Sequence, residues 1–477
     1  MKRKLFGIAV TACLVSSLAA CSSGSSGTTT AAAAAAETTA AAAESKEEAP
    51  KEEAASGEKK KITITFKDDG RGDKLPWYVW FQSGYETWEK KDEVELDLAP
   101  ITGSESDYYT KIALQLADKN TCPDIVMEDT FQLPNDVSAG YLTNLDSYVA
   151  DWADWSDGSF VESMKAGSTD ATGSVYGIPF STDTRGIWYN KEIFKQAGLP
   201  EDWQPETWQD ILDACAAVKA NVPDVIPFWC NSGVATGEAT SMQTYEMLLY
   251  GTGEQLLDAD GKWIVKSQAI QDTLQFISDI YTNGYGASLS MVLNGQATNT
   301  ARRELVPQGK VAMHLDGGWI YSNWVENGAS PWPEYTEVLG LAAMPKQNGG
   351  GSVTMCGGWT VAIPENADEK DLAFEFIKHC MDPESYTDGI ILNGSISTRT
   401  DTAQDEKYTS DVSLSRATDL LEGDAYFRPQ NEQYSVVTTS IQTMVEAVVS
   451  GSTPEEAMNQ YAMDVARVVG DDNVVEK

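Results

Sequence analysis

The sequence has 477 residues, which is enough for two or three domains' worth of hydrophobic core. Its 72 acidic and 34 basic side chains give a formal net charge of −38, and such a surface repels phosphate backbones, which argues against nucleic acid as a partner. Histidine occurs only as His314 and His379, so we expect neither His-based nucleophilic catalysis nor a metal site, and we expect no other cofactor.

The first residues predict export followed by lipid anchoring. Lys2, Arg3 and Lys4 form a basic n-region, and the apolar run that follows them is too short to span a bilayer as a stable anchor. The tetrapeptide Leu-Ala-Ala-Cys that ends at Cys21 matches a bacterial lipobox, whose cysteine thiol takes a diacylglyceryl group. We therefore predict a signal peptide over 1–20, lipidation of Cys21, and an extracytoplasmic protein held at the cell membrane.

Residues 21–60 predict a disordered tether. They contain Ser, Gly and Thr, then an alanine run, then Glu and Lys, with almost no apolar bulk to offset the entropy of ordering. Five cysteines lie beyond the signal and the lipid site, and an odd number of scattered cysteines is not a disulfide framework. We expect mostly buried free thiols with at most one or two bridges among Cys122, Cys215, Cys230, Cys356 and Cys380.

Alternating strands and helices are expected from residue 61 onward. The segment 62–66 alternates apolar and polar residues as a half-buried strand does, a helix is expected to end near residue 90, and 93–98 alternates again. Ser104 and Asp107 have the spacing of a capping box, which opens a helix. This strand–helix–strand order favours a mostly parallel sheet that binds ligands at the carboxyl ends of its strands.

The stretch 175–200 predicts a crossing between two packed regions. A short strand is expected to stop at Pro179, polar residues follow over 181–185, and a second apolar strand leads to a helix that ends at Gly198. Polar side chains concentrated between two buried runs are typical of a site at an interface. The alternative is a solvated loop with an internal ion pair between Asp183 and Arg185.

The second half of the chain repeats one motif beside two predicted strands. Gly-Gly-Trp ends at Trp319 after the strand expected over 310–315, and it ends again at Trp359 before the strand expected over 360–364. Two helices complete the chain, and the last opens at Thr453 with proline at its first position.

Several of these motifs, in this order, resemble the family 1 extracellular solute-binding proteins, which are the sugar-type receptors of ABC importers. The resemblance covers about 61–470, while 70–85 and 231–253 match none of its motifs. The motifs that carry it are Tyr-Gly-Ile-Pro at 176–179, Trp-Tyr-Asn-Lys at 188–191, Gly-Lys-x-Ala-Met at 309–313, and Gly-Gly-x-x-x-x-Ile-Pro at 357–364.

The resemblance implies an α/β fold of the type II periplasmic-binding-protein kind, with two lobes, mostly parallel sheets flanked by helices, and three interlobe crossings. The third crossing is expected at 394–399. Lobe 1 is expected in 61–180 plus 350–397, and lobe 2 in 181–349 plus 398–470. The implied protein is a monomer and not an enzyme: it closes on a sugar or oligosaccharide and delivers it to the permease of an ABC transporter.

A sugar presents C–H faces that stack on aromatic rings, and hydroxyls that pair with carboxylates, amides and guanidinium groups. Glycines beside such rings let backbone and ring approach a ligand closely. On these grounds and on the resemblance, the expected ligand-binding residues are Glu128, Asp129, Asp183, Arg185, Gly318, Trp319, Gly358 and Trp359.

Two alternatives stay open on the sequence alone. A secreted glycoside hydrolase needs two carboxylates that face each other across a bond, and acids are abundant here, although no Gly-x-Ser-x-Gly, P-loop or metal-ligand spacing is present. A receptor for another solute, such as a polyamine or a peptide, is the second alternative, because polyamine receptors favour acidic and aromatic clefts.

Overall fold

The computed structural model describes residues 59–170 and 172–477. The predicted signal peptide, Cys21 and nearly all of the predicted tether therefore lie outside the described residues. Among the helices that are described, none is long and apolar enough to cross a membrane. All five cysteines from Cys122 onward lie within the described ranges, and all five are free thiols, as expected.

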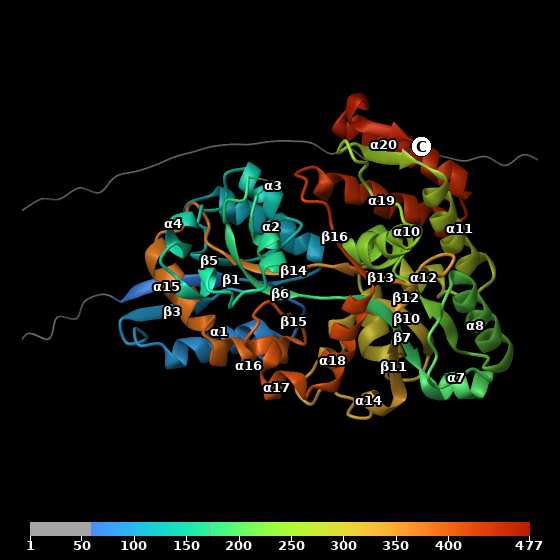
Figure 1. The fold of residues 1–477 in the computed structure, drawn as a ribbon, viewed down its shortest axis with the longest axis horizontal. Helices are drawn as coiled ribbons and strands as arrows, with labels where there is room; N and C mark the ends of the chain where they lie inside the picture. The colour runs from blue at the N-terminus through green and yellow to red at the C-terminus, as the bar shows by residue number, and fades with distance from the viewer. Residues whose placement is uncertain (1–58, 171) are drawn as a thin grey trace, which may run out of the picture. The chain divides into compact units, whose positions relative to one another are not determined.

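A six-stranded sheet with helices packed on it forms the first half of the described fold, which we call the six-stranded half (Figure 1). The strand order is β15-β6-β14-β5-β1-β3. Strand β1 runs parallel to β3 and β5, whereas β14 runs antiparallel to β5 and β6, and β15 runs antiparallel to β6. The strands are β1 (Lys60–Thr65), β3 (Val94–Leu98), β5 (Ile125–Asp129), β6 (Gly177–Thr182), β14 (Gly358–Ala362) and β15 (Ile396–Ser397).

A four-stranded sheet in the order β11-β7-β10-β8 centres the second half, the four-stranded half. Its central strand β10 is antiparallel to β7 and parallel to β8. A three-stranded sheet, β12-β13-β16, and two small pairs, β17-β9 and β2-β4, complete the described sheets. The strands are β2 (Lys67–Asp68), β4 (Ile101–Thr102), β7 (Arg185–Asn190), β8 (Ile226–Trp229), β9 (Trp263–Lys266), β10 (Val311–Gly317), β11 (Leu339–Ala342), β12 (Met344–Pro345), β13 (Ser352–Cys356), β16 (Asp424–Phe427) and β17 (Val474–Glu476).

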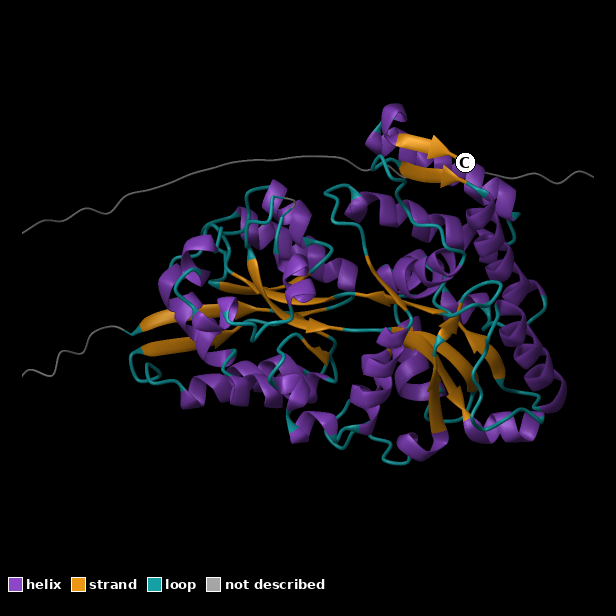
Figure 2. Ribbon diagram, viewed as in Figure 1, coloured by secondary structure: helices purple, strands orange, loops and turns teal. Residues whose placement is uncertain are grey.

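Helices flank the strands of both halves (Figure 2). In the six-stranded half, α1 packs against α15 and α16; in the four-stranded half, α19 and α20 pack against each other and against α11. The helices are α1 (Pro76–Thr87), α2 (Glu105–Ala117), α3 (Leu133–Ser138), α4 (Asp146–Val149), α5 (Ala153–Ser156), α6 (Glu162–Lys165), α7 (Lys191–Ala197), α8 (Trp208–Asn221), α9 (Glu238–Thr240), α10 (Met247–Gly251), α11 (Gln268–Thr282), α12 (Leu289–Val292), α13 (Ala297–Thr300), α14 (Tyr335–Val338), α15 (Lys370–Cys380), α16 (Pro383–Asn393), α17 (Glu406–Thr409), α18 (Val412–Asp419), α19 (Tyr434–Val449) and α20 (Pro454–Val469).

Local capping signals explain where several helices begin and end. Ser104 forms a capping box at the start of α2, and Thr453 forms one at the start of α20, so both predicted helix starts are confirmed. Helix α7 ends at Gly198, whose φ of 80° lies in the left-handed region that favours glycine.

Two short segments carry the chain directly between the halves. Strand β6 passes through Asp183 and Thr184 into β7, and β13 passes through Gly357 into β14. The crossings bond to each other, because the Gly357 amide donates to the Asp183 carboxylate at 2.7 Å, and the Arg185 amide donates to the Thr354 hydroxyl at 2.8 Å. The predicted first crossing is therefore confirmed, and it is tied to a second one.

The third crossing was predicted at 394–399, and this position is wrong. Strand β15 still pairs with β6, and the Arg399 guanidinium forms ion pairs with Asp154 at 2.9 Å and Asp401 at 2.7 Å. These contacts keep the segment in the six-stranded half. The chain reaches the other half later, at α18, where the Thr184 hydroxyl donates to the Ala417 carbonyl at 2.7 Å.

The prediction of mostly parallel sheets is also wrong. In the described part of the two larger sheets, three of the eight strand pairings are parallel. The cause is the crossings: a strand that leaves one half and a strand that returns to it run in opposite directions, as β6 and β14 do. Pro179 does not stop its strand either, because it lies at an irregularity in the β6–β14 register, where proline is tolerated.

Candidate functional site

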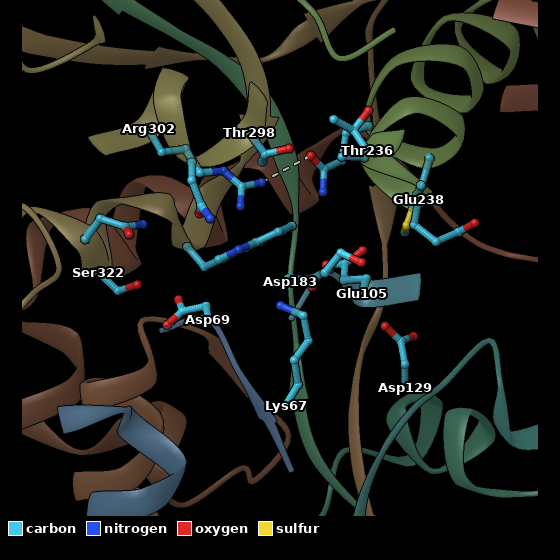
Figure 3. Close-up of a pocket in the computed structure, with 18 of the residues that line it drawn as sticks. Lys67, Asp69, Glu105, Asp129, Asp183, Thr236, Glu238, Thr298, Arg302 and Ser322 are labelled. Atoms are coloured by element: carbon cyan, nitrogen blue, oxygen red, sulfur yellow. Dashed lines mark hydrogen bonds between the residues drawn. The ribbon is translucent and has the colours of Figure 1, made fainter. Parts of the chain in front are cut away.

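A cavity of about 200 Å³ lies between the two halves, beside the crossings. Figure 3 shows side chains from both halves pointing into it, among them Asp129 at the end of β5 and Glu238 at the start of α9. The first crossing supplies Asp183 and Arg185 to its wall, and the segment after β10 supplies Trp319. Its lining is rich in charged and aromatic groups.

Five of the predicted site residues line this cavity, and three do not. Asp129, Asp183, Arg185, Trp319 and Trp359 are lining residues. The three predicted residues that do not line the cavity are Glu128, Gly318 and Gly358.

Glu128 does not reach the cavity because successive side chains of a strand point to opposite faces. Its neighbour Asp129 faces the cavity, so Glu128 faces the other side, toward Asp136 of α3. Burial and the Asp136 carboxylate raise the pKa of Glu128 well above its usual value. Glu128 is therefore buried against α3 and is not part of the cavity wall.

The two glycines are needed for backbone packing. Gly358 has a φ of +144°, and a Cβ there would lie 1.9 Å from the carbonyl oxygen of Ser181. A Cβ on Gly318 would lie 2.7 Å from the Cβ of Ala417. Both glycines hold neighbouring segments close together, which is a different role from the ligand approach expected from the sequence.

The wall at the first crossing combines an ion pair with a stacked ring. The Arg185 guanidinium pairs with Asp183, donates to the Met355 carbonyl at 3.1 Å, and lies 4.7 Å from the centroid of the Trp319 ring. The internal Asp183–Arg185 pair considered in the alternative reading does exist. Its surroundings are not a solvated loop, however, because Arg185 is buried and both side chains line the cavity.

Trp359 belongs to an aromatic cluster on the side of the six-stranded half. Its ring meets the ring of Trp77 edge to face, with centroids 4.6 Å apart, and it also contacts Tyr108 at 6.1 Å. Trp77 also lines the cavity, and its buried indole nitrogen has no hydrogen-bond partner among the described residues.

Arg428 was not predicted, and it links the two halves. Its guanidinium donates to Asp129 at 2.6 Å and to Glu238 at 3.1 Å, and it lies 4.3 Å from the centroid of the Phe131 ring. Burial raises the pKa of Asp129 to about 6, although the charge of Arg428 opposes this shift. We call Asp183, Arg185, Asp129, Glu238 and Arg428 the hinge wall.

Another buried acid, Glu246, is linked to the hinge wall through Tyr434. The Tyr434 hydroxyl is 2.6 Å from a carboxylate oxygen of Glu246 and 3.0 Å from one of Glu238. Burial and the charge of Glu238 raise the pKa of Glu246 to about 8. One phenolic hydrogen cannot serve both carboxylates at once. With a pKa of about 8, Glu246 is mostly protonated near neutral pH, so its own hydrogen is available for the second contact.

Four other lining residues are partly exposed, and we call them the mouth cluster: Lys67, Asp69, Arg71 and Arg303. Asp69 accepts from Arg71 Nε at 3.0 Å and from Arg303 Nη2 at 2.9 Å. Nearby, Arg302 forms a bidentate pair with the buried Asp316, at 2.8 and 2.7 Å.

The segments that matched no motif supply much of the wall. Arg71, Leu75 and Trp77 come from the first such segment, and 235–239 with Met242 and Gln243 come from the second. The second segment includes a π-helical turn over 241–246, a geometry that is frequent at functional sites. Its unusual hydrogen-bonding pattern leaves no periodic signal that sequence reasoning could have used.

The described chain has two sheet-bearing halves, segments that cross between them, and a cavity beside the crossings. This arrangement defines a two-lobe binding protein. Residues 72–387 match the family model described as bacterial extracellular solute-binding protein. The match spans more than half of the chain, and the chain belongs to this family of extracellular binding proteins.

Curated relatives are distant. The chain is 25% identical over 281 residues to the lactose-binding protein of Rhizobium radiobacter, a match that covers 57% of this chain and 60% of that protein. It is 24% identical over 183 residues to the sn-glycerol-3-phosphate-binding periplasmic protein UgpB of Brucella abortus, which covers 38% of each.

Two solved structures share this chain's fold over nearly the whole of their own length. An ABC transporter solute-binding protein from Thermotoga lettingae bound with α-D-tagatose superposes with a TM-score of 0.73 at 24% identity, over 86% of this chain and 100% of that one. Maltose-bound MalE3 of T. maritima gives a TM-score of 0.70 at 22% identity, over 85% and 99%. The predicted two-lobe α/β fold is thereby confirmed.

Proposed function

We propose that this protein is a carbohydrate-binding receptor that closes on a sugar or oligosaccharide and delivers it to the permease of an ABC transporter. The observation that carries the proposal is the cavity between the halves, which brings Trp319, Asp183 and Arg185 to one wall. An aromatic ring beside guanidinium–carboxylate pairs suits a ligand with C–H faces and hydroxyls. Proteins of similar sequence or fold bind lactose, tagatose and maltose by their names.

The crossings are where we propose that the halves hinge. A ligand that contacts both halves favours their closed arrangement by its extra contacts there. In this proposal lobe 1 is the six-stranded half and lobe 2 is the four-stranded half, so the lobe bounds expected from the sequence change at 350–356 and after 397. The receptor acts as a monomer that a lipid on Cys21 anchors to the outer face of the membrane.

The arrangement of charges favours binding over hydrolysis and over a cationic ligand. Asp69, Asp129, Asp183 and Glu238 each pair with at least one arginine, so these carboxylates are engaged as acceptors instead of facing each other across a bond. The same arginines repel a polyamine, which disfavours that alternative.

A thermal-shift screen against mono- and oligosaccharides tests the proposal. We expect at least one saccharide to raise the melting temperature, since a ligand that binds only the folded state stabilises it by mass action. Chromatography of the same mixtures should return that saccharide intact. Cleaved product, or no shift with any saccharide, would contradict the proposal.

A further inference from the structure

The arginines of this chain are concentrated in the cavity. The sequence contains about two acidic side chains for each basic one, 72 against 34. Among the described residues, the cavity lining reverses this balance, with six basic side chains and five acidic ones. Five of the nine arginines in the sequence are among them: Arg71, Arg185, Arg302, Arg303 and Arg428.

Most of these guanidinium groups are already occupied. Arg428 bridges two carboxylates, Arg185 pairs with Asp183, and Arg302 is held by Asp316. Each is held by at least one carboxylate, although the buried Nε of Arg185 and that of Arg428 have no hydrogen-bond partner among the described residues. These three arginines therefore explain the architecture of the wall without requiring a charged ligand.

The mouth cluster is different because its donors outnumber its acceptors. Asp69 is shared by Arg71 and Arg303, and only the Nε of Arg71 is used in that pair. The two terminal nitrogens of Arg71 donate to no described residue, and the Lys67 ammonium has neither an ion pair nor a hydrogen bond within the described ranges. Figure 3 shows Lys67 extending into the cavity from its strand.

The nearby acids do not use these donors. The Asp68 carboxylate accepts from the amides of Gly70, Arg71 and Gly72 and from the Thr102 hydroxyl. Glu105 lines the cavity but pairs with neither cation in the described structure. Burial and the charges of Arg71 and Arg302 lower the pKa of Arg303, which reflects the local crowding of cations.

We propose that the ligand is an anionic carbohydrate, one whose carboxylate or phosphate ester binds Arg71 and Lys67 at the mouth of the cavity. This inference rests on the proposed carbohydrate-receptor function. The free edge of the Arg71 guanidinium offers two parallel N–H groups, a geometry that matches two oxygens of a carboxylate or phosphate. Lys67 adds a point charge, and the hinge wall receives the hydroxyls and the C–H face of the sugar.

Pairs of neutral and acidic ligands with the same sugar separate recognition of the charge from recognition of the sugar. The probes are galactose and glucose, their uronates, their 6-phosphates, and short oligogalacturonides beside neutral galacto-oligosaccharides, each tested by thermal shift and then by titration calorimetry. We expect the tightest ligand to be acidic, and its affinity to fall as NaCl is raised, because salt screens partly exposed charges. Comparison of uronates with phosphates identifies which anion the site takes.

Two variants test whether Arg71 and Lys67 contact the anionic group of the ligand. Arg71→Gln and Lys67→Gln should each weaken the acidic ligand by about ten- to hundred-fold, the loss typical of a charge-assisted hydrogen bond. Arg467→Gln is the matched control, since this arginine lies on α20 with a side chain that is 72% exposed, and it should leave affinity unchanged. Lys67→Gln removes no described contact, so it keeps the test valid even if Arg71→Gln disturbs the loop.

The outcomes distinguish this inference from the function on which it rests. A neutral saccharide as the tightest ligand, or full affinity in both variants, would overturn the inference and leave the carbohydrate receptor standing. No shift with any saccharide, neutral or acidic, would overturn both.

Discussion

The hinge wall and the mouth cluster use the same kinds of residues in opposite ways. In the hinge wall, Arg428 and Arg185 are buried, and carboxylates and backbone carbonyls accept from them. In the mouth cluster, Arg71 and Lys67 are partly exposed and keep donors unused within the described structure. The difference indicates that charge at the wall holds the halves in register, whereas charge at the mouth is available to a ligand.

The largest effect is expected from breaking the wall. Arg428→Ala leaves Asp129 and Glu238 buried without their shared partner, so we expect the free energy of unfolding in urea to fall by about 3–5 kcal/mol. Arg467→Ala, which removes an exposed arginine, should change it by less than about 0.5 kcal/mol. Equal effects of the two substitutions would contradict a special role for the wall.

The next largest effect on stability is expected from the protonation of Glu246, which contacts Tyr434 beside the hinge wall. Glu246 has a folded-state pKa of about 8 against an ordinary 4.5, so between these values the folded state binds more protons than the unfolded state and stability falls as pH rises. The slope reaches about 1.4 kcal/mol per pH unit. Asp129, with a pKa of about 6, adds to the slope only below that pH.

Glu246→Gln isolates this contribution, because an amide can still donate to the Tyr434 hydroxyl. Urea unfolding at pH 6.5 and at pH 8 should show a steep loss of stability in the original protein and a flatter profile in the variant. A profile of unchanged steepness would mean that Glu246 is ionised in the folded state.

A smaller effect on binding is expected at the first crossing. Asp183→Ala removes the acceptor of Arg185 and of the Gly357 amide, so the cognate saccharide should bind about 1.5–3 kcal/mol more weakly by titration calorimetry. Serine in place of alanine should recover part of the loss, since a hydroxyl can still accept from the amide. Unaltered affinity in Asp183→Ala would remove this residue from the site.

The smallest effect should come from the mouth. Asp69→Asn weakens two partly exposed ion pairs, with Arg71 and Arg303, and pairs of this kind contribute about 0.2–1 kcal/mol to stability. Urea unfolding should therefore detect little change. A loss as large as that of Arg428→Ala would show that the mouth is structural as well, and the contrast between the two regions would fail.

The sequence predicted the parts of the site that lie in recognisable motifs. Asp183 and Arg185 were predicted from their place between two apolar runs, and Trp319 from its place after a strand and two glycines. All three line the cavity, and their contact with a ligand stays a prediction. Glu128 shows the limit of that approach, because its neighbour Asp129 faces the cavity and a shift of one residue along a strand reverses the face.

Other parts depend on packing between distant segments. Arg428 meets Asp129 across 299 residues of sequence, and a single charged residue after a strand carries no periodic signal. Arg71 lies in a loop without a motif for the same reason. The antiparallel pairings were missed because strand order predicts parallel pairing only when consecutive strands stay in one sheet, and here the chain crosses between sheets.

The most direct measurement is a crystal structure of the protein with the tightest saccharide from the ligand panel. Our account predicts the sugar between the halves, with a ring face on Trp319 or Trp359, hydroxyls at Asp183, and its charged group at Arg71. A saccharide bound outside this cavity, or one that touches a single half, would contradict it.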